Sequence, residues 1–252
     1  MKLLDPLARL GRFGRFAGRV VIRMITPPWE LDAIANHLWS VFVRCLLPVL
    51  ATTVPLGMVM ALQGLAIFDR YGAQGMLSPL ISVATLRELS PVLASVLVAA
   101  QAGSSFAAEL GAMRIREELD ATSVMAVDPI RVHVVPRMVA LIVACPLLNL
   151  VGSVGGICGG WITAVAVNGE SNGAYWGNLW DLTHPMDLWG GFVKTFVFGW
   201  IIGLVACFHG YHAEGGAPGV GRAVNDTVVI ACTAFVVANY FLTSALFGAS
   251  GS

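Results

Sequence analysis

The chain has 252 residues, of which 57% are hydrophobic and only 12% are charged. Soluble domains carry roughly 25% charged residues, so this composition excludes an ordinary soluble fold. The 15 basic and 15 acidic side chains cancel, and their placement along the sequence is more informative than their sum.

Residues 1–37 are expected to form an amphipathic segment at the membrane surface. Arginines recur at steps of three and four, with apolar residues mainly on another side of the predicted helix, at Arg9, Arg12, Arg15, Arg19 and Arg23. Such a helix lies flat on an anionic membrane surface. The alternative is a basic topogenic leader with no further role. The pair Pro27–Pro28 is expected to end the helix.

Five stretches without Asp, Glu, Lys or Arg follow, and each is long enough to cross a bilayer. A spanning helix needs about 20 apolar residues, and lipid offers the backbone no other hydrogen-bond partner. The sequence therefore predicts an all-α polytopic membrane protein. Its five transmembrane helices are expected at about residues 45–68, 89–108, 138–165, 193–211 and 227–248.

The basic residues predict the orientation of these spans. With Arg44 set aside as an edge residue, eleven Lys and Arg lie before the first span and in the second and fourth connections, against three on the opposite side, Arg70, Arg87 and Lys194. This asymmetry places the N-terminus in the cytoplasm and the C-terminus outside. The outer connection from Asp69 to Glu88 is expected to be a short loop, with turns at Gly72, Gly75 and Pro79.

Several residues inside the spans are expected to serve packing. Gly152, Gly156 and Gly160 recur at four-residue spacing, which lets helix backbones approach closely. The same structural role is expected of the polar residues Gln63, Gln101, Asn149 and Asn239, as interhelical hydrogen-bonding groups.

Five cysteines without a C-x-x-C pair are expected to act as small hydrophobes. Pro48 and Pro55 indicate that the first span is deformable, as expected of a helix that lines a cavity. The alternative is that proline is simply tolerated in this membrane helix.

One loop carries most of the polar information in the chain. Nine of the 30 charged residues fall between Glu109 and Arg137. Acidic residues at the start of a predicted helix complement its dipole, while the apolar segment Val124–Val127 needs a partner or the membrane to cover it. The pair Asp128–Pro129 is typical of the end of one helix followed by the start of another, which the Asp side chain caps. We interpret the loop as a docking surface. Contact with lipid headgroups alone is the alternative, which its acidity disfavours at an anionic surface.

These segments resemble the membrane permease of MCE-associated ABC transport systems, the MlaE/YrbE type. The resemblance covers most of the chain after about Leu38, so residues 38–252 are expected to be the permease domain. The leader and the motif HGYHAEGGAPGVGRAV look most similar to the actinobacterial YrbE branch. The motifs that carry the resemblance are Glu109–Gly111, Glu117–Asp120, Val124–Pro129, Val135–Arg137 and Gly215–Val224.

The resemblance implies a permease of the bacterial plasma membrane that works as a homodimer or a paralogous heterodimer around a lipid cavity. Its implied partners are MCE proteins that carry lipid and a cytoplasmic ATPase dimer that binds ATP and Mg. It also implies that a coupling helix docks on the ATPase, carried here by Glu117, Glu118, Asp120, Ala121, Val124, Met125, Asp128 and Pro129. Family members often have Gly where this chain has Ala126. Spans one, two and five are implied to line the cavity, and residue type selects Val54, Met58, Leu62 and Leu65.

Nothing in the sequence indicates catalysis by this chain. It has no G-x-x-x-x-G-K-[ST] phosphate loop, and the spacing around Gly215 to Gly221 does not fit G-x-G-x-x-G. We therefore expect no cofactor, no metal and no nucleic-acid partner. The glycines are expected to form a tight turn, with Asn225 or Asp226 capping the last span. His209 and His212, three residues apart, raise the alternative of a metal site or a proton relay, but Glu214 is the one carboxylate whose spacing could partner them.

Two other function classes stay open. An intramembrane serine hydrolase or acyltransferase would need a nucleophile motif, and no G-x-S-x-G spacing is present. An ion-coupled secondary transporter usually needs acidic residues within its spans, and the predicted spans contain none.

Overall fold

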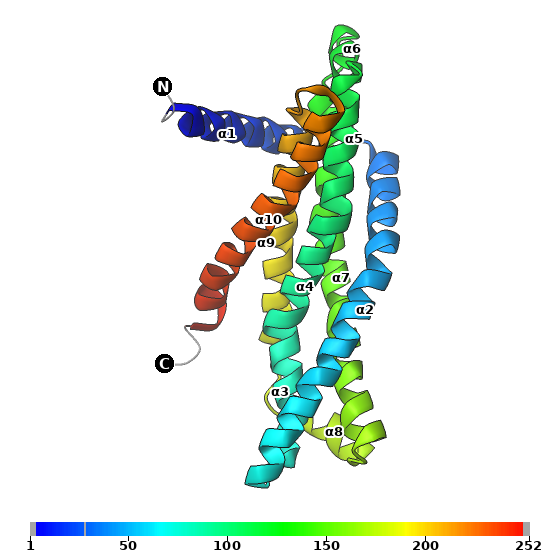
Figure 1. Cartoon of the computed structure of the whole chain (residues 1–252), viewed down its shortest axis with the longest axis vertical. Helices are drawn as coiled ribbons and strands as arrows, with labels where there is room; N and C mark the ends of the chain where they lie inside the picture. Colours follow the sequence, from blue (N-terminus) through cyan, green and yellow to red (C-terminus); the bar gives the residue numbers. More distant parts are fainter. Residues whose placement is uncertain (1–3, 28, 249–252) are drawn as a thin grey trace.

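The computed structural model describes residues 4–27 and 29–248, which form helices and no strand. The short amphipathic helix α1 (Leu4–Ile25) lies crosswise near one end of an elongated bundle (Figure 1). Helix α6 (Glu118–Val124) marks this end of the bundle, and α8 (Asn172–Asn178) marks the other. The long helices are α2 (Leu31–Tyr71), α7 (Val135–Trp161), α9 (Pro185–Tyr211) and α10 (Gly216–Phe247).

The fifth long element consists of three helices joined without a break. Helices α3 (Leu77–Ala84), α4 (Ser90–Val98) and α5 (Ser104–Ile115) are linked by π-helical turns at Thr85–Leu89 and Ala99–Gly103. Similar π-helical turns extend α7 at both ends, at Ile130–Val134 and Ile162–Val167. The described residues thus contain five helices that are long and apolar enough to cross a membrane. The predicted all-α polytopic fold is confirmed.

The predicted outer loop from Asp69 to Glu88 is wrong. Only a short turn at Gly72 (φ +65°) and one turn of 3-10 helix separate α2 from α3, and Pro79 lies inside α3. Arg87 and Glu88 belong to the continuous helix Leu77–Ile115. Sequence reasoning ended the span at its first charged residue, but charged side chains remain in a helix when neighbouring helices supply partners.

The start of α10 also differs from the sequence-based expectation. The helix begins at Gly216, directly after Gly215, which adopts a left-handed conformation with φ +86°. Asn225 and Asp226 lie more than two turns inside it. Pro218 does not interrupt the helix. Backbone N–H groups in the first turn have no intrahelical acceptor, so the N–H that proline lacks is not needed at this position.

Glycines bring α2 and α7 into backbone contact. A Cβ atom at Gly57 would overlap the carbonyl oxygen of Gly156, and one at Gly159 would overlap that of Val54. Gly156 also faces Thr85, whose Cγ2 would lie 2.7 Å from an added Cβ. Gly152 and Gly160 show similarly close neighbours on the same side of α7, Ser90 and Ile81. These helices therefore approach as closely as glycine allows.

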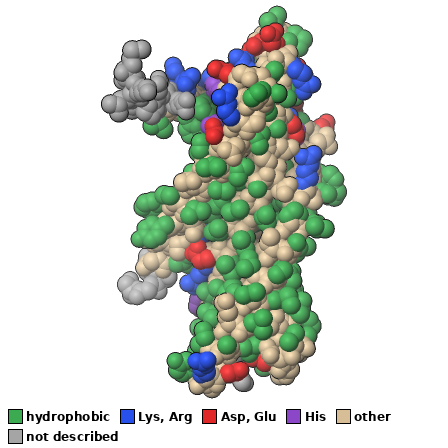
Figure 2. Space-filling view, in the orientation of Figure 1, with side chains coloured by type: hydrophobic (Ala, Val, Ile, Leu, Met, Phe, Trp, Pro, Cys, Tyr) green, Lys and Arg blue, Asp and Glu red, His purple; other side chains and the backbone are tan. Residues whose placement is uncertain are grey.

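The surface of the bundle carries apolar side chains over its middle, while charged side chains gather at its two ends (Figure 2). On the face shown, one charged group also lies partway along the bundle, near the end of α10 (Figure 2). All five cysteines are free thiols, and Cys45, Cys145 and Cys207 are buried among apolar neighbours. The expectation that they act as small hydrophobes fits this packing.

Helix α1 is docked on the bundle through its apolar side. Phe16 and Val20 are completely buried, and Phe16 contacts the rings of Phe208 and Tyr211 in α9. Its predicted amphipathic character therefore corresponds to a packed face and an exposed basic face. The helix ends at Ile25, and Pro28 lies outside the described residues.

Candidate functional site

Helix α6 projects from its end of the bundle with an acidic start and an apolar end. Leu119, 1% exposed, anchors it to the protein. At its other end, Val124 is 86% exposed and Met125 is 69% exposed. The exposed residues are Glu117, Glu118, Asp120, Ala121, Val124 and Met125, six of the eight positions assigned to coupling from the sequence. An apolar tip beside carboxylates is a surface that a protein partner would cover.

Internal ion pairs fix the acidic part of α6. Arg114 Nη1 lies 2.6 Å from Asp120 Oδ1, and Arg116 Nε lies 3.3 Å from Glu118 Oε1. Thr122 also donates a hydrogen bond to the carbonyl oxygen of Glu118. The two ion pairs join α6 to the end of α5, so that the two helices form one unit.

The remaining two of the eight positions face the protein interior. Pro129 is buried, and Asp128 is half-buried. Asp128 Oδ2 lies 2.6 Å from Arg23 Nε of α1, and its Oδ1 accepts a hydrogen bond of 3.0 Å from the Ile130 amide. The predicted stop and capped restart are therefore present. Asp128 connects α1 to the chain between α6 and α7.

Two residues that flank α6 adopt left-handed backbone conformations. Glu117 has φ +57° and Ala126 has φ +60°. An L-residue with a Cβ atom pays roughly 1–2 kcal/mol for this conformation, whereas glycine does not. The geometry at Ala126 is thus one that glycine adopts without this penalty.

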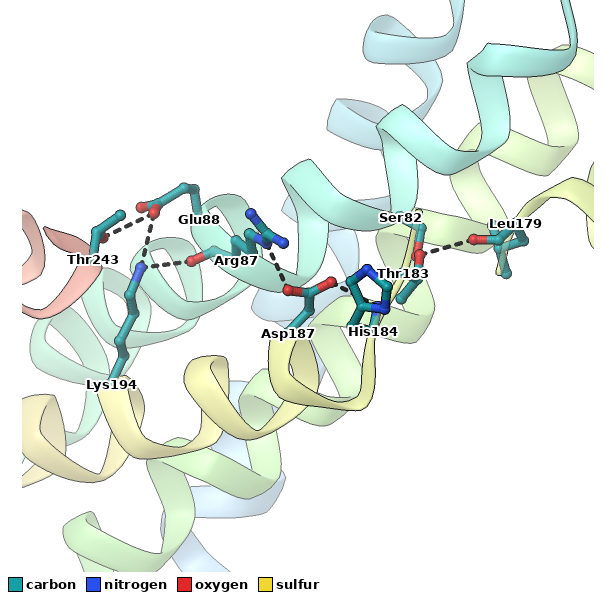
Figure 3. A network of polar contacts seen from close by, with 9 residues as sticks. All are labelled: Ser82, Arg87, Glu88, Leu179, Thr183, His184, Asp187, Lys194 and Thr243. Atoms are coloured by element: carbon teal, nitrogen blue, oxygen red, sulfur yellow. Dashed lines mark hydrogen bonds and ion pairs between the residues drawn. The ribbon is translucent and has the colours of Figure 1, made fainter. Parts of the chain in front are cut away.

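A second group of polar side chains connects three helices partway along the bundle (Figure 3). Lys194 of α9 is fully buried and donates hydrogen bonds of 2.8 Å to Glu88 Oε1 and to the Arg87 carbonyl oxygen. Glu88 also accepts hydrogen bonds of 2.9 Å from Asn239 and Thr243 of α10. The interhelical bond expected of Asn239 is present.

This polar group continues through Arg87 to the start of α9. Arg87 Nε lies 2.7 Å from Asp187 Oδ1, and Asp187 is 1% exposed. Asp187 Oδ2 accepts a hydrogen bond from the amide of His184, which caps α9 (Figure 3). Arg87 also lies over the ring of Phe247, 4.7 Å from its centroid. Glu88, Lys194 and α10 are thus held in one network.

Sequence reasoning missed this network because it treated Arg87 and Lys194 only as topology markers. One signal was available: Glu88 and Lys194 each directly precede one of the five charge-free stretches, and Arg87 precedes Glu88. Charged residues beside or within a membrane span are costly unless they are paired. The sequence gives no partner for them, since Glu88 and Lys194 are far apart along the chain.

The four cavity positions proposed on α2 differ in accessibility. Leu62 is 52% exposed, while Val54 and Met58 are half-buried. Val54 borders a shallow apolar hollow of about 510 Å³ on the surface of α2. Leu65 is only 7% exposed and packs inside the subunit in a cluster with Leu77. Three of the four are therefore available to a neighbouring molecule.

His209 and His212 lie at the end of α9, where both line one polar hollow. His212 packs against the rings of Phe208 and Phe16 and contacts the Phe208 carbonyl oxygen at 3.0 Å. Among the residues that the structure describes, no group of three His, Cys, Asp or Glu side chains could hold a metal ion.

Comparison with known proteins places this arrangement in a family. Residues 34–245 match the family described as Permease MlaE. A probable ABC transporter permease protein of Rickettsia felis is 36% identical over 94% of this chain and 92% of its own length. The intermembrane phospholipid transport system permease protein MlaE of Haemophilus influenzae is 31% identical over 98% and 95% of the two chains. The chloroplastic protein TRIGALACTOSYLDIACYLGLYCEROL 1 of Arabidopsis thaliana is 32% identical over 93% of this chain and 67% of its own. The chain is thus a multi-pass transport subunit that belongs to the MlaE permease family.

Proposed function

We propose that this chain is the permease subunit of an ABC-type lipid transporter in the bacterial plasma membrane. It would work as a pair, a homodimer or a paralogous heterodimer, together with MCE proteins and a separate ATPase dimer that binds ATP and Mg. The name of the Haemophilus relative, a phospholipid transport system permease, supports lipid as the substrate class. The observation that carries the proposal is α6, an exposed helix with an apolar tip at one end of the bundle.

The position of α6 suits the transmission of force from an ATPase to the spans. Its acidic start is paired with the end of α5 through Arg114, and the turn after it is paired with α1 through Asp128. Because α5 continues into α4, a partner that displaces Met125 would move a complete span and α1 together. We place this end of the molecule in the cytoplasm, as the distribution of Lys and Arg predicts.

The lipid path in this proposal lies between two permease subunits. Val54, Met58 and Leu62 would contribute one wall from α2, and the exposed apolar residues of α10 another. The α10 residues assigned to this wall are Val229, Val236, Val237, Tyr240 and Phe241. An apolar wall suits an acyl chain, and transport requires that two states of the subunit pair bind it with different affinity.

The Glu88 network bears on the ion-coupled alternative. Glu88 lies inside a long helix, contrary to the expectation that the spans contain no acidic residue. Its carboxylate oxygens, however, accept bonds from Lys194, Asn239 and Thr243, so a positive charge already balances it. The network fits a structural link between α10 and its neighbours better than a cation site. We therefore retain the ATP-driven permease.

Co-purification tests the proposal. The variant Met125→Asp is expected to lose the ATPase subunit, because a carboxylate replaces the apolar contact, while the permease stays in the membrane. Met186→Asp is the matched control, since Met186 is 53% exposed at the start of α9, away from α6. The control should retain the ATPase subunit. Equal retention by Met125→Asp would remove the docking role of α6.

A further inference from the structure

An apolar crevice lies between α1, α9 and α10, near the end of the bundle marked by α6. It has a volume of about 640 Å³ and opens on the surface of the molecule. Its lining is almost entirely apolar and comes from all three helices, through Leu10, Phe13, Ile201, Leu204, Val205 and Ile230. At its border it shares Phe208, His209 and Asp226 with a second, polar hollow of about 360 Å³.

The polar side of this crevice is rich in arginine. Arg12 lines the second hollow together with Arg222, Glu214 and Asp226. A third hollow, of about 500 Å³, is lined by Arg12, Arg15, Arg19 and His212. Four arginines thus face two carboxylates, which leaves an excess of positive charge.

Three of these arginines have no acidic partner within the described part of the chain. Arg12, Arg15 and Arg19 are exposed on one side of α1, whereas Arg23 on the same helix is paired with Asp128. Burial lowers the pKa of His212, and the charges of Arg12, Arg19 and Arg114 lower it further, although its bond to Phe208 opposes them. The side chains of Arg12, Arg15 and Arg19 make the site electropositive, which favours the neutral form of His212.

We propose that this crevice binds one acidic phospholipid of the surrounding leaflet. Its phosphate would lie on Arg12, Arg15 and Arg19, and one acyl chain would lie in the crevice between α9 and α10. Charge and polarity support this occupant, because an apolar slot that continues into a basic hollow complements an amphiphile with an anionic head. The crevice is lined by the C-terminal part of α9 and residues 226–234 of α10, beside α1 and near the charged end of the bundle that Figure 2 shows, a depth at which lipid headgroups are present.

This lipid would differ from the transported one. The proposed path uses α2 and α10, whereas the crevice uses α1 and α9 together with a different set of α10 residues, Asp226, Ile230 and Ala234. A lipid bound there would hold α1 against the bundle, and α1 is joined through Arg23 to the turn that follows α6. The inference requires that the chain spans a membrane, but it does not require an ATPase partner.

Native mass spectrometry of the full-length chain in detergent tests the proposal, with phosphatidylglycerol or phosphatidylcholine added. The wild type is expected to retain phosphatidylglycerol preferentially. The variant R12Q/R15Q/R19Q should lose roughly a hundredfold in affinity for it, since each of the three arginines near an anionic headgroup contributes about 1 kcal/mol and each 1.4 kcal/mol is about a factor of ten. The variant R44Q/R70Q is the control, because both of its arginines are exposed on α2, outside this site. It should bind as the wild type does.

A second variant tests the apolar part of the site. Ala234 borders the crevice, so Ala234→Trp should fill it and reduce retention of both lipids. Equal binding of the two lipids by the wild type, or unchanged binding by R12Q/R15Q/R19Q, would overturn the proposal. The triple substitution leaves the buried face of α1 intact, so its thermal stability should match that of the control. Because no ATPase subunit is present, failure of this test leaves the proposed transport function untouched.

Discussion

Arg23 and Asp128 join the amphipathic helix α1 to the turn that follows α6, with 2.6 Å between Arg23 Nε and Asp128 Oδ2. The same carboxylate accepts the Ile130 amide at the start of the next helix. One residue therefore caps a helix and holds a second helix in place. A motion of α6 would reach α1 through this contact as well as through α5.

Substitution of Asp128 should reduce the stability of the protein more than substitution of Arg23. Asp128→Ala removes both the ion pair and the cap, so we expect a loss of about 1–2 kcal/mol in stability. Arg23→Gln removes only an exposed ion pair and should cost about 1 kcal/mol or less. Thermal unfolding in detergent measures both. Equal losses for the two variants would show that the bond from Asp128 to the Ile130 amide contributes nothing.

The backbone at Ala126 predicts a stabilising substitution. Ala126→Gly should raise stability by about 1 kcal/mol, because glycine adopts φ +60° without a steric penalty. The matched control is Ala121→Gly inside α6, where glycine should instead cost about 1 kcal/mol. Thermal unfolding measures the stability of both variants. A stability change of the same sign in Ala126→Gly and Ala121→Gly would refute the backbone strain at Ala126.

The Glu88 network predicts a non-additive pair of substitutions. Glu88→Ala leaves the buried ammonium of Lys194 without its carboxylate and should destabilise the chain by about 3 kcal/mol. The double variant Glu88→Gln with Lys194→Met removes both charges and should be more stable than Glu88→Ala. Urea or thermal unfolding in detergent gives the comparison. A double variant that is less stable than the single one would contradict the assignment of Glu88 as the partner of Lys194.

The contact between α2 and α7 predicts intolerance at one glycine and tolerance at another. Gly159→Ala should cost about 3 kcal/mol or prevent folding, because its Cβ would overlap the Val54 carbonyl oxygen and separate the helices. Gly221→Ala is the control, since nothing lies within 4 Å of an added Cβ there. It should raise stability by about 1 kcal/mol through helix propensity. The yield and melting temperature of the purified proteins are the readout, and a stable Gly159→Ala protein would argue against the close approach.

Sequence alone predicted the class of fold, the number of spans and the exposed part of α6. Charge-free runs are sufficient for this because the bilayer imposes helical structure on them. The positions of Arg87 and Glu88 could not be predicted, since their partners Asp187 and Lys194 come from α9 and only the packed structure brings them together. For the same reason the sequence did not show that Asp128 points inward to α1.

The central claim is that α6 contacts an ATPase subunit, and photocross-linking from residue 125 tests it most directly. A photoreactive amino acid in place of Met125 should cross-link to the ATPase subunit in cells that produce the whole transporter. The same group in place of Trp180, 65% exposed just after α8, should give no such product. A cross-link to the ATPase subunit from residue 180 but not from residue 125 would contradict the account.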